Sequence, residues 1–314
     1  MGNVALGAPE LPWLLALGPI RYRLDQVTMA ARDTAAGGSA VRQEAAREHA
    51  MRVTSSLDGT PLAYEVHGAG TPCLVLVHGW SCDRSYWKGQ VRSLARSFQV
   101  VTLDLAGHGD SGQGRFDWTI EAFGADVAAV ADELGLESMI LVGHSMGGEV
   151  VLEAARRLAG RVAGLVWLDT YQQLASFRSP QQVEERLAPF RADFGGTTEA
   201  FVRSLFHPKA DPSLVRRVAE RMAVARPEIA LAALESDWSF GPRAVAILKE
   251  LELPVIAINP EVPLTDLESL QHHGVDVLLM PGVGHFPMME DPERLNDLLL
   301  EAIGSIQRRT ARSR

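Results

Sequence analysis

Short, largely apolar runs that alternate with helical patterns constrain this chain more than any other feature of its sequence. The runs are CLVLVHG (73–79), FQVVTLDL (98–105), SMILVGHS (138–145), VAGLVWLD (162–169), LPVIAIN (253–259) and VDVLLMPG (275–282). Runs of this kind are typical of parallel strands that are buried on both faces. Helical patterns separate them, for example over residues 119–134, 147–158 and 292–307. We therefore predict an α/β fold with a doubly wound, mostly parallel sheet.

The alternation stops between Asp169 and Leu253. This stretch carries several helical patterns, for example over 180–190, 211–225 and 227–236, and no convincing strand. A loop of this length without secondary structure is uncommon in a compact domain. We therefore predict a helical cap over residues 171–250, inserted over the carboxyl ends of the strands. Residues 51–170 and 251–314 are then predicted to form the core.

Residues 1–50 lack the strand-like runs of the later chain, and we interpret them as an N-terminal extension that is poorly ordered. Two interpretations stay open: translation starts at Met51, or the extension is a loose arm that docks on the domain. The segment MRVTSSLDGTPLAYEVHG follows, with two strand patterns around Asp58 and Gly59. An Asp-Gly pair between such patterns predicts a hairpin that begins the domain.

Composition and charge exclude several functional classes. The net charge is −9, from 30 basic and 39 acidic residues, which argues against a nucleic-acid partner. The two cysteines, Cys73 and Cys82, lie in no disulfide or metal-ligand pattern, so we expect no metal, no cofactor and a reducing compartment. The early apolar stretch 11–20 is about half the length that spans a bilayer. We therefore expect no membrane span and a cytoplasmic protein.

The most informative motif is G-x-S-x-G, which occurs as Gly143-His-Ser145-Met-Gly147. It follows a buried strand and opens an amphipathic helix. In this context the serine occupies a strained turn, and its neighbours must be small where strand and helix nearly touch. The hydroxyl of Ser145 then projects above the sheet, and we interpret Ser145 as a catalytic nucleophile.

Two further segments supply the partners that a serine nucleophile needs. Val77-His-Gly-Trp80 follows an earlier strand and is typical of an oxyanion loop, in which the backbone N–H groups of Trp80 and Met146 stabilise a developing oxyanion. Glycines around His285, after the last strand, allow that side chain to reach over the sheet edge, so we predict His285 as the general base. His78 and His144 are interpreted as packing or hydrogen-bonding residues.

These motifs together resemble the α/β-hydrolase family over roughly residues 52–308. Besides HGW, GHSMGG and GVGHFPMMEDPERLN, the run from Asp104 to Ser111 is similar to that family's D-x-x-G-x-G-x-S turn. The resemblance implies a Ser–His–acid triad that acts through an acyl-enzyme. It also places the cap after the strand that follows the nucleophile unit.

The sequence offers three candidates for the acid of this triad. In many relatives an aspartate follows the penultimate strand, but here that turn reads Asn259-Pro-Glu-Val-Pro-Leu-Thr-Asp266 and the expected slot falls near Val262. Asp169 ends the strand directly after the nucleophile unit, where some lipases and haloalkane dehalogenases of this fold have their acid. We therefore predict Asp169, with Glu261 and Asp266 as alternatives.

The nucleophile narrows the chemistry, because dehalogenases and epoxide hydrolases of this fold need a carboxylate in its place. We expect hydrolysis of a carboxylic ester or a related small acyl substrate. One alternative is perhydrolase, haloperoxidase-like or C–C bond hydrolase activity on the same triad. The other is a non-catalytic ligand-binding protein. The natural substrate and the oligomeric state are left open, because specificity depends on the cap.

Overall fold

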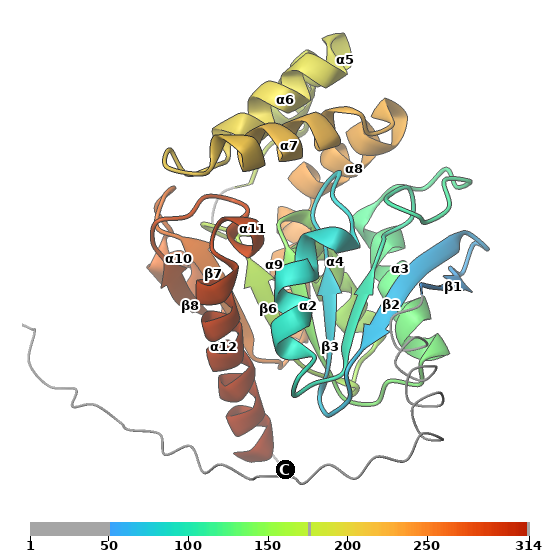
Figure 1. Cartoon of the computed structure of the whole chain (residues 1–314), viewed down its shortest axis with the longest axis vertical. Coiled ribbons are helices and arrows are strands. Elements are labelled where there is room, and N and C mark those ends of the chain that lie inside the picture. The colour runs from blue at the N-terminus through green and yellow to red at the C-terminus, as the bar shows by residue number, and fades with distance from the viewer. Residues whose placement is uncertain (1–50, 175–176, 313–314) are drawn as a thin grey trace, which may run out of the picture. The chain divides into compact units, whose positions relative to one another are not determined.

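The computed structural model describes residues 51–174 and 177–312. At its centre is an eight-stranded sheet with the order β1-β2-β4-β3-β5-β6-β7-β8 (Figure 1). The first three strands in this order pair antiparallel, and all later neighbours pair in parallel. The strands are β1 (Arg52–Ser55), β2 (Pro61–His67), β3 (Cys73–Val77), β4 (Val100–Leu103), β5 (Met139–His144), β6 (Val162–Leu168), β7 (Val255–Pro260) and β8 (Val275–Met280).

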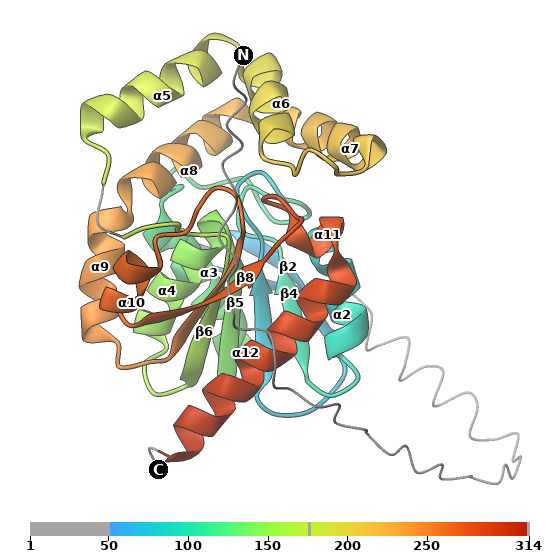
Figure 2. The same cartoon turned by 90° about the vertical axis from the view of Figure 1, so that its left-hand side faces the viewer.

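Helices cover both faces of this sheet. One face carries α3 (Ile120–Glu133), α4 (Met146–Arg157) and α9 (Gly241–Glu250), and the other carries α2 (Lys88–Leu94) and α12 (Pro292–Arg312) (Figure 2). Each predicted apolar run contains one of the strands β3–β8, so the predicted doubly wound α/β fold is confirmed. The strands β3–β7 lack a polar/apolar alternation because nearly all of their residues are buried, whereas the edge strand β8 is only partly buried.

The helical insertion after β6 is also confirmed. Its helices α5 to α8 lie beyond the carboxyl ends of the parallel strands (Figures 1 and 2). They are α5 (Pro180–Ala192), α6 (Phe194–Ser204), α7 (Pro212–Ala223) and α8 (Pro227–Ser239). The helix α9 behaves differently, since it packs against α4 beside the sheet although it falls within residues 171–250. The division of the chain into extension, core and cap stays a prediction.

Short elements complete the fold between the main ones. They are the 3-10 helix η1 (Arg84–Trp87) and the helices α10 (Leu267–His272) and α11 (Pro287–Glu290). The predicted hairpin is present as β1 and β2, where the N–H of Gly59 donates to the carbonyl of Ser56 at 2.9 Å and φ of Gly59 is 84°. The predicted extension 1–50 lies outside the described residues. Among the described helices, none is long and apolar enough to cross a membrane.

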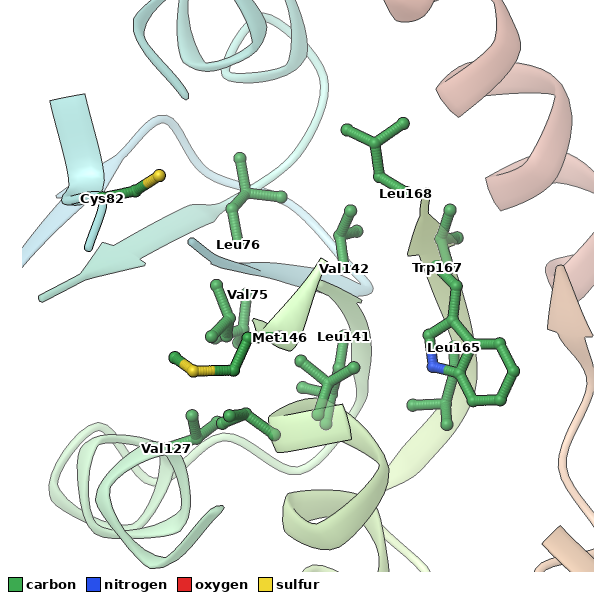
Figure 3. Close-up of a cluster of buried hydrophobic side chains, with 14 of the residues drawn as sticks. Val75, Leu76, Cys82, Val127, Leu141, Val142, Met146, Leu165, Trp167 and Leu168 are labelled. Atoms are coloured by element: carbon green, nitrogen blue, oxygen red, sulfur yellow. The ribbon is translucent and has the colours of Figure 1, made fainter. Parts of the chain in front are cut away.

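The core between the sheet and α3/α4 follows from strand register. Val75, Leu141 and Leu165 are register partners on β3, β5 and β6, so their side chains point to the same face. Val127 of α3 and Met146 of α4 lie on this side (Figure 3). All five side chains are fully buried or nearly so. The helix α4, which follows Ser145, is thereby held on the sheet by apolar packing.

A buried ion pair links α3 to the loops around the hairpin. The carboxylate of Asp126, with no exposed surface, accepts hydrogen bonds from Ser56 Oγ at 2.6 Å and from Arg115 Nη2 at 2.5 Å. It also accepts from the N–H of Ala106 at 3.3 Å. Loss of one partner of a buried pair leaves the other charge unsatisfied, which is the expensive outcome for such pairs.

We expect Asp126→Ala to lower the free energy of unfolding by about 3 kcal/mol, because Arg115 would lose its buried carboxylate and keep only the partly exposed Asp58, 3.2 Å from its Nε. Asp132→Ala is the matched control, since Asp132 pairs with Arg161 at the surface and should contribute less than about 1 kcal/mol. Urea denaturation of both variants measures the two values. Equal losses would show that burial does not set the strength of these pairs.

Candidate active site

A cavity of about 890 Å³ lies where the carboxyl ends of β5 and β6 meet the inserted helices. The predicted residues Trp80, Ser145, Asp169 and His285 all line it. Asp266 lines it as well, whereas Glu261 does not. Segments far apart in the chain therefore meet in one cavity.

Ser145 occupies a strained turn between β5 and α4. Its φ and ψ are 53° and −123°, which is unfavourable for a residue with a Cβ atom. The conformation is held on both sides: the N–H of Ser145 donates to the carbonyl of Leu168 at 2.9 Å, and its carbonyl accepts from the N–H of Gly148 at 2.8 Å. The side chain is partly exposed to the cavity.

The glycines of the motif allow this turn. A Cβ atom on Gly143 would lie 2.1 Å from the carbonyl oxygen of Gly147. A Cβ on Gly147 would lie 2.6 Å from the carbonyl oxygens of Val77 and His78. The start of α4 therefore approaches both β5 and the end of β3 more closely than any larger residue permits.

His285 and Asp169 are joined by a direct hydrogen bond. His285 Nδ1 donates to Asp169 Oδ2 at 2.6 Å. The side chain of Asp169 is 3% exposed and that of His285 is 19% exposed, so the pair is largely shielded from water. Donation from Nδ1 leaves Nε2 of the neutral imidazole as the proton acceptor.

A second contact orients the Asp169 carboxylate. Gln172 Nε2 donates to Asp169 Oδ1 at 2.5 Å, so both carboxylate oxygens have partners. The backbone of Asp169 has φ 47° and its N–H donates to the carbonyl of Ile258 on β7 at 3.0 Å. The alternative acids lie elsewhere: Asp266 caps α10 by accepting from the N–H of Ser269 at 2.9 Å, and Glu261 is exposed.

The loop that carries His285 is fixed by hydrogen bonds on every side. The N–H of His285 donates to the carbonyl of Leu205, in the inserted helical region, at 2.8 Å. Its carbonyl accepts from His144 Nε2 at 2.7 Å. The Glu290 carboxylate accepts from the N–H groups of both neighbours, Gly284 at 3.0 Å and Phe286 at 3.1 Å.

The two predicted oxyanion donors differ in their surroundings. Met146 is the first residue of α4, so its N–H has no carbonyl partner within the helix. The side chain of Trp80 is anchored separately, because its Nε1 donates to the carbonyl of Ala230 on α8 at 2.7 Å. Its ring also packs edge-on against Phe190 and Phe201. The indole of Trp80 therefore joins the core to the inserted helices. This contact is independent of the predicted role of the Trp80 backbone N–H group as an oxyanion donor.

His78 and His144 are buried and neutral. His78 Nδ1 donates to the carbonyl of Gly79 at 2.8 Å, and its Nε2 accepts from the N–H of Leu105 at 3.1 Å. Desolvation lowers the pKa of His78 to about 4 and holds the pKa of His144 well below its usual value. Both therefore stay uncharged near neutral pH, and each supports a turn beside Ser145.

A buried acidic group in the cavity wall was not predicted from sequence. Tyr171 donates from its hydroxyl to Glu149 Oε1 at 2.5 Å, and Glu149 also shares a hydrogen bond with Asp237. Two carboxyl groups can share a hydrogen bond only when one of them is protonated. Desolvation raises the pKa of Glu149 well above its usual value, so Glu149 carries the proton.

Several supporting residues carry no sequence signal of their role. Gln172 and Glu149 belong to no motif: Gln172 contacts Asp169 only through the path of the loop after β6, and Glu149 contacts residues from other segments. Glu290 is the exception, since it lies within the GVGHFPMMEDPERLN segment, five residues after His285. In the described part of the chain, no group of His, Cys, Asp and Glu has the arrangement of a metal site.

Comparison with known proteins agrees with this geometry. A model of the alpha/beta hydrolase family matches residues 74–298. A non-heme haloperoxidase from Rhodococcus erythropolis is 41% identical over 118 residues, which are 37% of this chain and 43% of that protein. A putative carbamate hydrolase from Azorhizobium caulinodans is 33% identical over 172 residues, 53% of this chain and 60% of that protein. The chain thus spans about half the length of these curated relatives.

Among solved structures, a thermophilic esterase from Thermogutta terrifontis superposes with a TM-score of 0.71 at 27% identity. The superposition covers 82% of this chain and 99% of that one. The family match extends over well more than half of the chain, including the serine turn and the histidine loop. This chain belongs to the alpha/beta hydrolase family.

Proposed function

We propose that this protein is a serine hydrolase that cleaves a carboxylic ester or a related acyl substrate through an acyl-enzyme. The observation that carries the proposal is the 2.6 Å hydrogen bond from His285 Nδ1 to Asp169 in the wall of the cavity that Ser145 also lines. The bond selects the tautomer in which Nε2 accepts a proton, as a general base for Ser145 requires. The esterase among the structural relatives supports the same class of reaction.

The reaction follows from these groups in two steps. Ser145 Oγ bonds to the substrate carbonyl carbon while its proton passes to Nε2 of His285, and the carbonyl π electrons move to oxygen. The ester C–O bond then breaks, and the leaving alcohol takes the proton from His285. Water repeats the sequence on the acyl-enzyme, which releases the acid and restores Ser145. Asp169 stabilises the imidazolium in both steps.

The N–H groups of Met146 and Trp80 are proposed to stabilise the oxyanion. Met146 has the free donor of a helix N-terminus, where the helix dipole also favours negative charge. Trp80 follows β3, and its indole anchor on α8 would hold the backbone donor in place. One such donor is typically worth about 10²–10³ in rate.

A perhydrolase reaction is the second candidate, supported by the 41% identity to a non-heme haloperoxidase. In that case hydrogen peroxide instead of water attacks the acyl-enzyme, and a peracid is released. The two activities share the formation of the acyl-enzyme. They differ only in whether water or hydrogen peroxide then attacks it. Peracid formation that outpaces ester hydrolysis in the presence of peroxide would favour the second candidate.

We further propose that Glu290 acts as a positioning residue for His285. Its carboxylate accepts from the N–H groups on both sides of His285 and from the N–H of His207 in the inserted region at 3.2 Å. Charge-assisted hydrogen bonds of this kind are stronger than neutral ones. Their loss would allow the histidine to move while its pairing partner Asp169 stays in place.

The protein is proposed to act in the cytoplasm. Cys73 and Cys82 are free and buried, and burial raises the pKa of Cys73 to about 12. Thiols that stay protonated and unpaired are compatible with a reducing compartment.

Two substitutions test the triad. Ser145→Ala should abolish hydrolysis of p-nitrophenyl acetate and labelling by a fluorophosphonate probe, because no nucleophile remains. Asp169→Asn should lower kcat by about 10⁴ with little loss of stability, since the amide favours the wrong histidine tautomer. Steady-state kinetics and thermal unfolding measure both effects.

Near-normal turnover in Asp169→Asn would transfer the role of the acid to Glu261 or Asp266. Wild-type protein that is neither labelled by the probe nor active on any ester would instead support the non-catalytic, ligand-binding alternative.

For Glu290→Ala we expect kcat to fall about 10- to 100-fold with KM nearly unchanged, because a misplaced base affects the transition state more than binding. Glu290→Gln, which keeps an acceptor oxygen, should recover part of the loss. Glu293→Ala is the control, since Glu293 is exposed on α12 and contacts no part of the histidine loop. If Glu290→Ala lowered KM and the stability of the protein but left kcat unchanged, the positioning role would be contradicted.

A further inference from the structure

Charged side chains that take no part in the proposed triad line one lobe of the cavity. They come from α4, from the segment before α5, from α5 itself and from α8. The residues are Glu149, Arg178, Arg186 and Asp237. Charges that line a substrate cavity act directly on the ligand. The sum of the positive and negative charges therefore indicates which charge on a ligand the cavity favours.

The two acids of this lobe carry one negative charge between them. Glu149 is 4% exposed and holds the shared proton, while Tyr171 donates to its other oxygen. Asp237 is half-buried and is the ionised partner at neutral pH, with burial raising its pKa to about 6. The positive charge of Arg178 acts on Asp237 and opposes this rise. Asp237 and Arg178 therefore balance one another.

The guanidinium group of Arg186 has no carboxylate of this kind to offset its charge. Arg178 and Arg186 both lie over the ring of Trp238, with their Cζ atoms 5.9 and 4.7 Å from its centroid. Within the described residues, no carboxylate oxygen lies within 4 Å of either guanidinium as an ion-pair partner. Desolvation and the neighbouring Arg178 lower the pKa of Arg186. Like charges are thus held together beside the cavity.

Arg178 and Arg186 are exposed side chains, but the ring over which they lie is packed into the inserted helices. The ring of Trp238 packs edge-on against the buried ring of Phe190, with 6.0 Å between the two centroids. This contact holds the Trp238 ring in place beneath the two guanidinium groups. Other arginines of the inserted region, such as Arg191 and Arg203, are paired with carboxylates. The two arginines at Trp238 differ from them because they line the cavity and neither forms an ion pair within 4 Å with a carboxylate of the described residues.

We infer that Arg178 and Arg186, stacked on Trp238, form a subsite for a carboxylate on the substrate. The inference rests on the proposed ester hydrolysis and specifies its substrate class: esters whose acyl part ends in a free carboxylate, such as monoesters of dicarboxylic acids. A guanidinium binds a carboxylate through two parallel N–H···O bonds, and a stacked guanidinium is already oriented for them. Binding would also relieve the repulsion between the two arginines.

The test compares matched esters that differ only in charge. The p-nitrophenyl monoesters of glutaric and adipic acid carry the free carboxylate, and their methyl-capped counterparts have the same shape without it. We expect kcat/KM of the wild type to favour the free acid by about tenfold or more, as expected for one charge-assisted contact. Raising the ionic strength should reduce this preference.

The double substitution Arg178→Gln/Arg186→Gln should remove the preference, by lowering kcat/KM for the free acid about tenfold or more to the value for the capped ester. Arg191→Gln is the control for Arg186: it also removes one positive charge from α5, but Arg191 pairs with Glu184 and Glu235 away from the cavity. Its preference should equal that of the wild type. Arg186→Glu should in turn favour an ester that ends in an ammonium group.

Each outcome decides the matter. Equal or faster hydrolysis of the capped ester by the wild type would overturn the carboxylate subsite and leave the proposed hydrolase intact. A preference that persists in the double variant would overturn the assignment to these arginines. Failure to hydrolyse either ester, together with no labelling of Ser145, would overturn the proposed function itself.

Discussion

The close approach of α4 to the ends of β3 and β5 is the constraint on which the site depends. Gly147 lies against the carbonyls at the end of β3, and Gly143 lies against the carbonyl of Gly147, with no room for a side chain at either position. The chain can turn from strand to helix there only if Ser145 takes a left-handed, strained conformation. Apolar packing of Met146 and its neighbours holds α4 down and offsets that strain. One contact thus exposes the proposed nucleophile, Ser145, and places a helix N-terminus beside it.

The inserted helices act on the site as well as enclosing it. They accept a hydrogen bond from the N–H of His285 through the carbonyl of Leu205, and they hold the indole of Trp80 through the carbonyl of Ala230. The proposed base and one proposed oxyanion donor therefore both depend on contacts with the insertion. A change in the packing of α6 or α8 would shift the carbonyls of Leu205 and Ala230. It would thereby displace the proposed base, His285, and the loop that carries Trp80. The inserted helices thus both line the cavity and hold groups of the proposed catalytic site.

Much of the architecture could be predicted because it is encoded locally. Continuous apolar runs indicate strands covered on both faces, and this prediction holds for β3 to β8. The strand-turn-helix context of Ser145 likewise lies within one short segment. The acidic partner of His285 is not encoded locally in this way. Asp169, Glu261 and Asp266 all follow neighbouring strands, and the path of a loop cannot be derived from its composition. In the structure only Asp169 reaches the imidazole, because its backbone is held by Ile258 and its side chain by Gln172.

The sequence by itself determined the sheet, the helical insertion, the strained serine and the membership of the alpha/beta hydrolase family. Each of these depends on periodicity or on residues close together in the chain. The tertiary structure alone decided the carboxylate that contacts His285, the three N–H groups that meet at Glu290, and the pairing of Glu149 with Asp237. The same holds for the two arginines stacked on Trp238. Most of these contacts join residues tens of positions apart, and the short-range ones, from Gly284 and Phe286 to Glu290, depend on how the histidine loop folds. The charge states depend on burial, which exists only once the chain has folded.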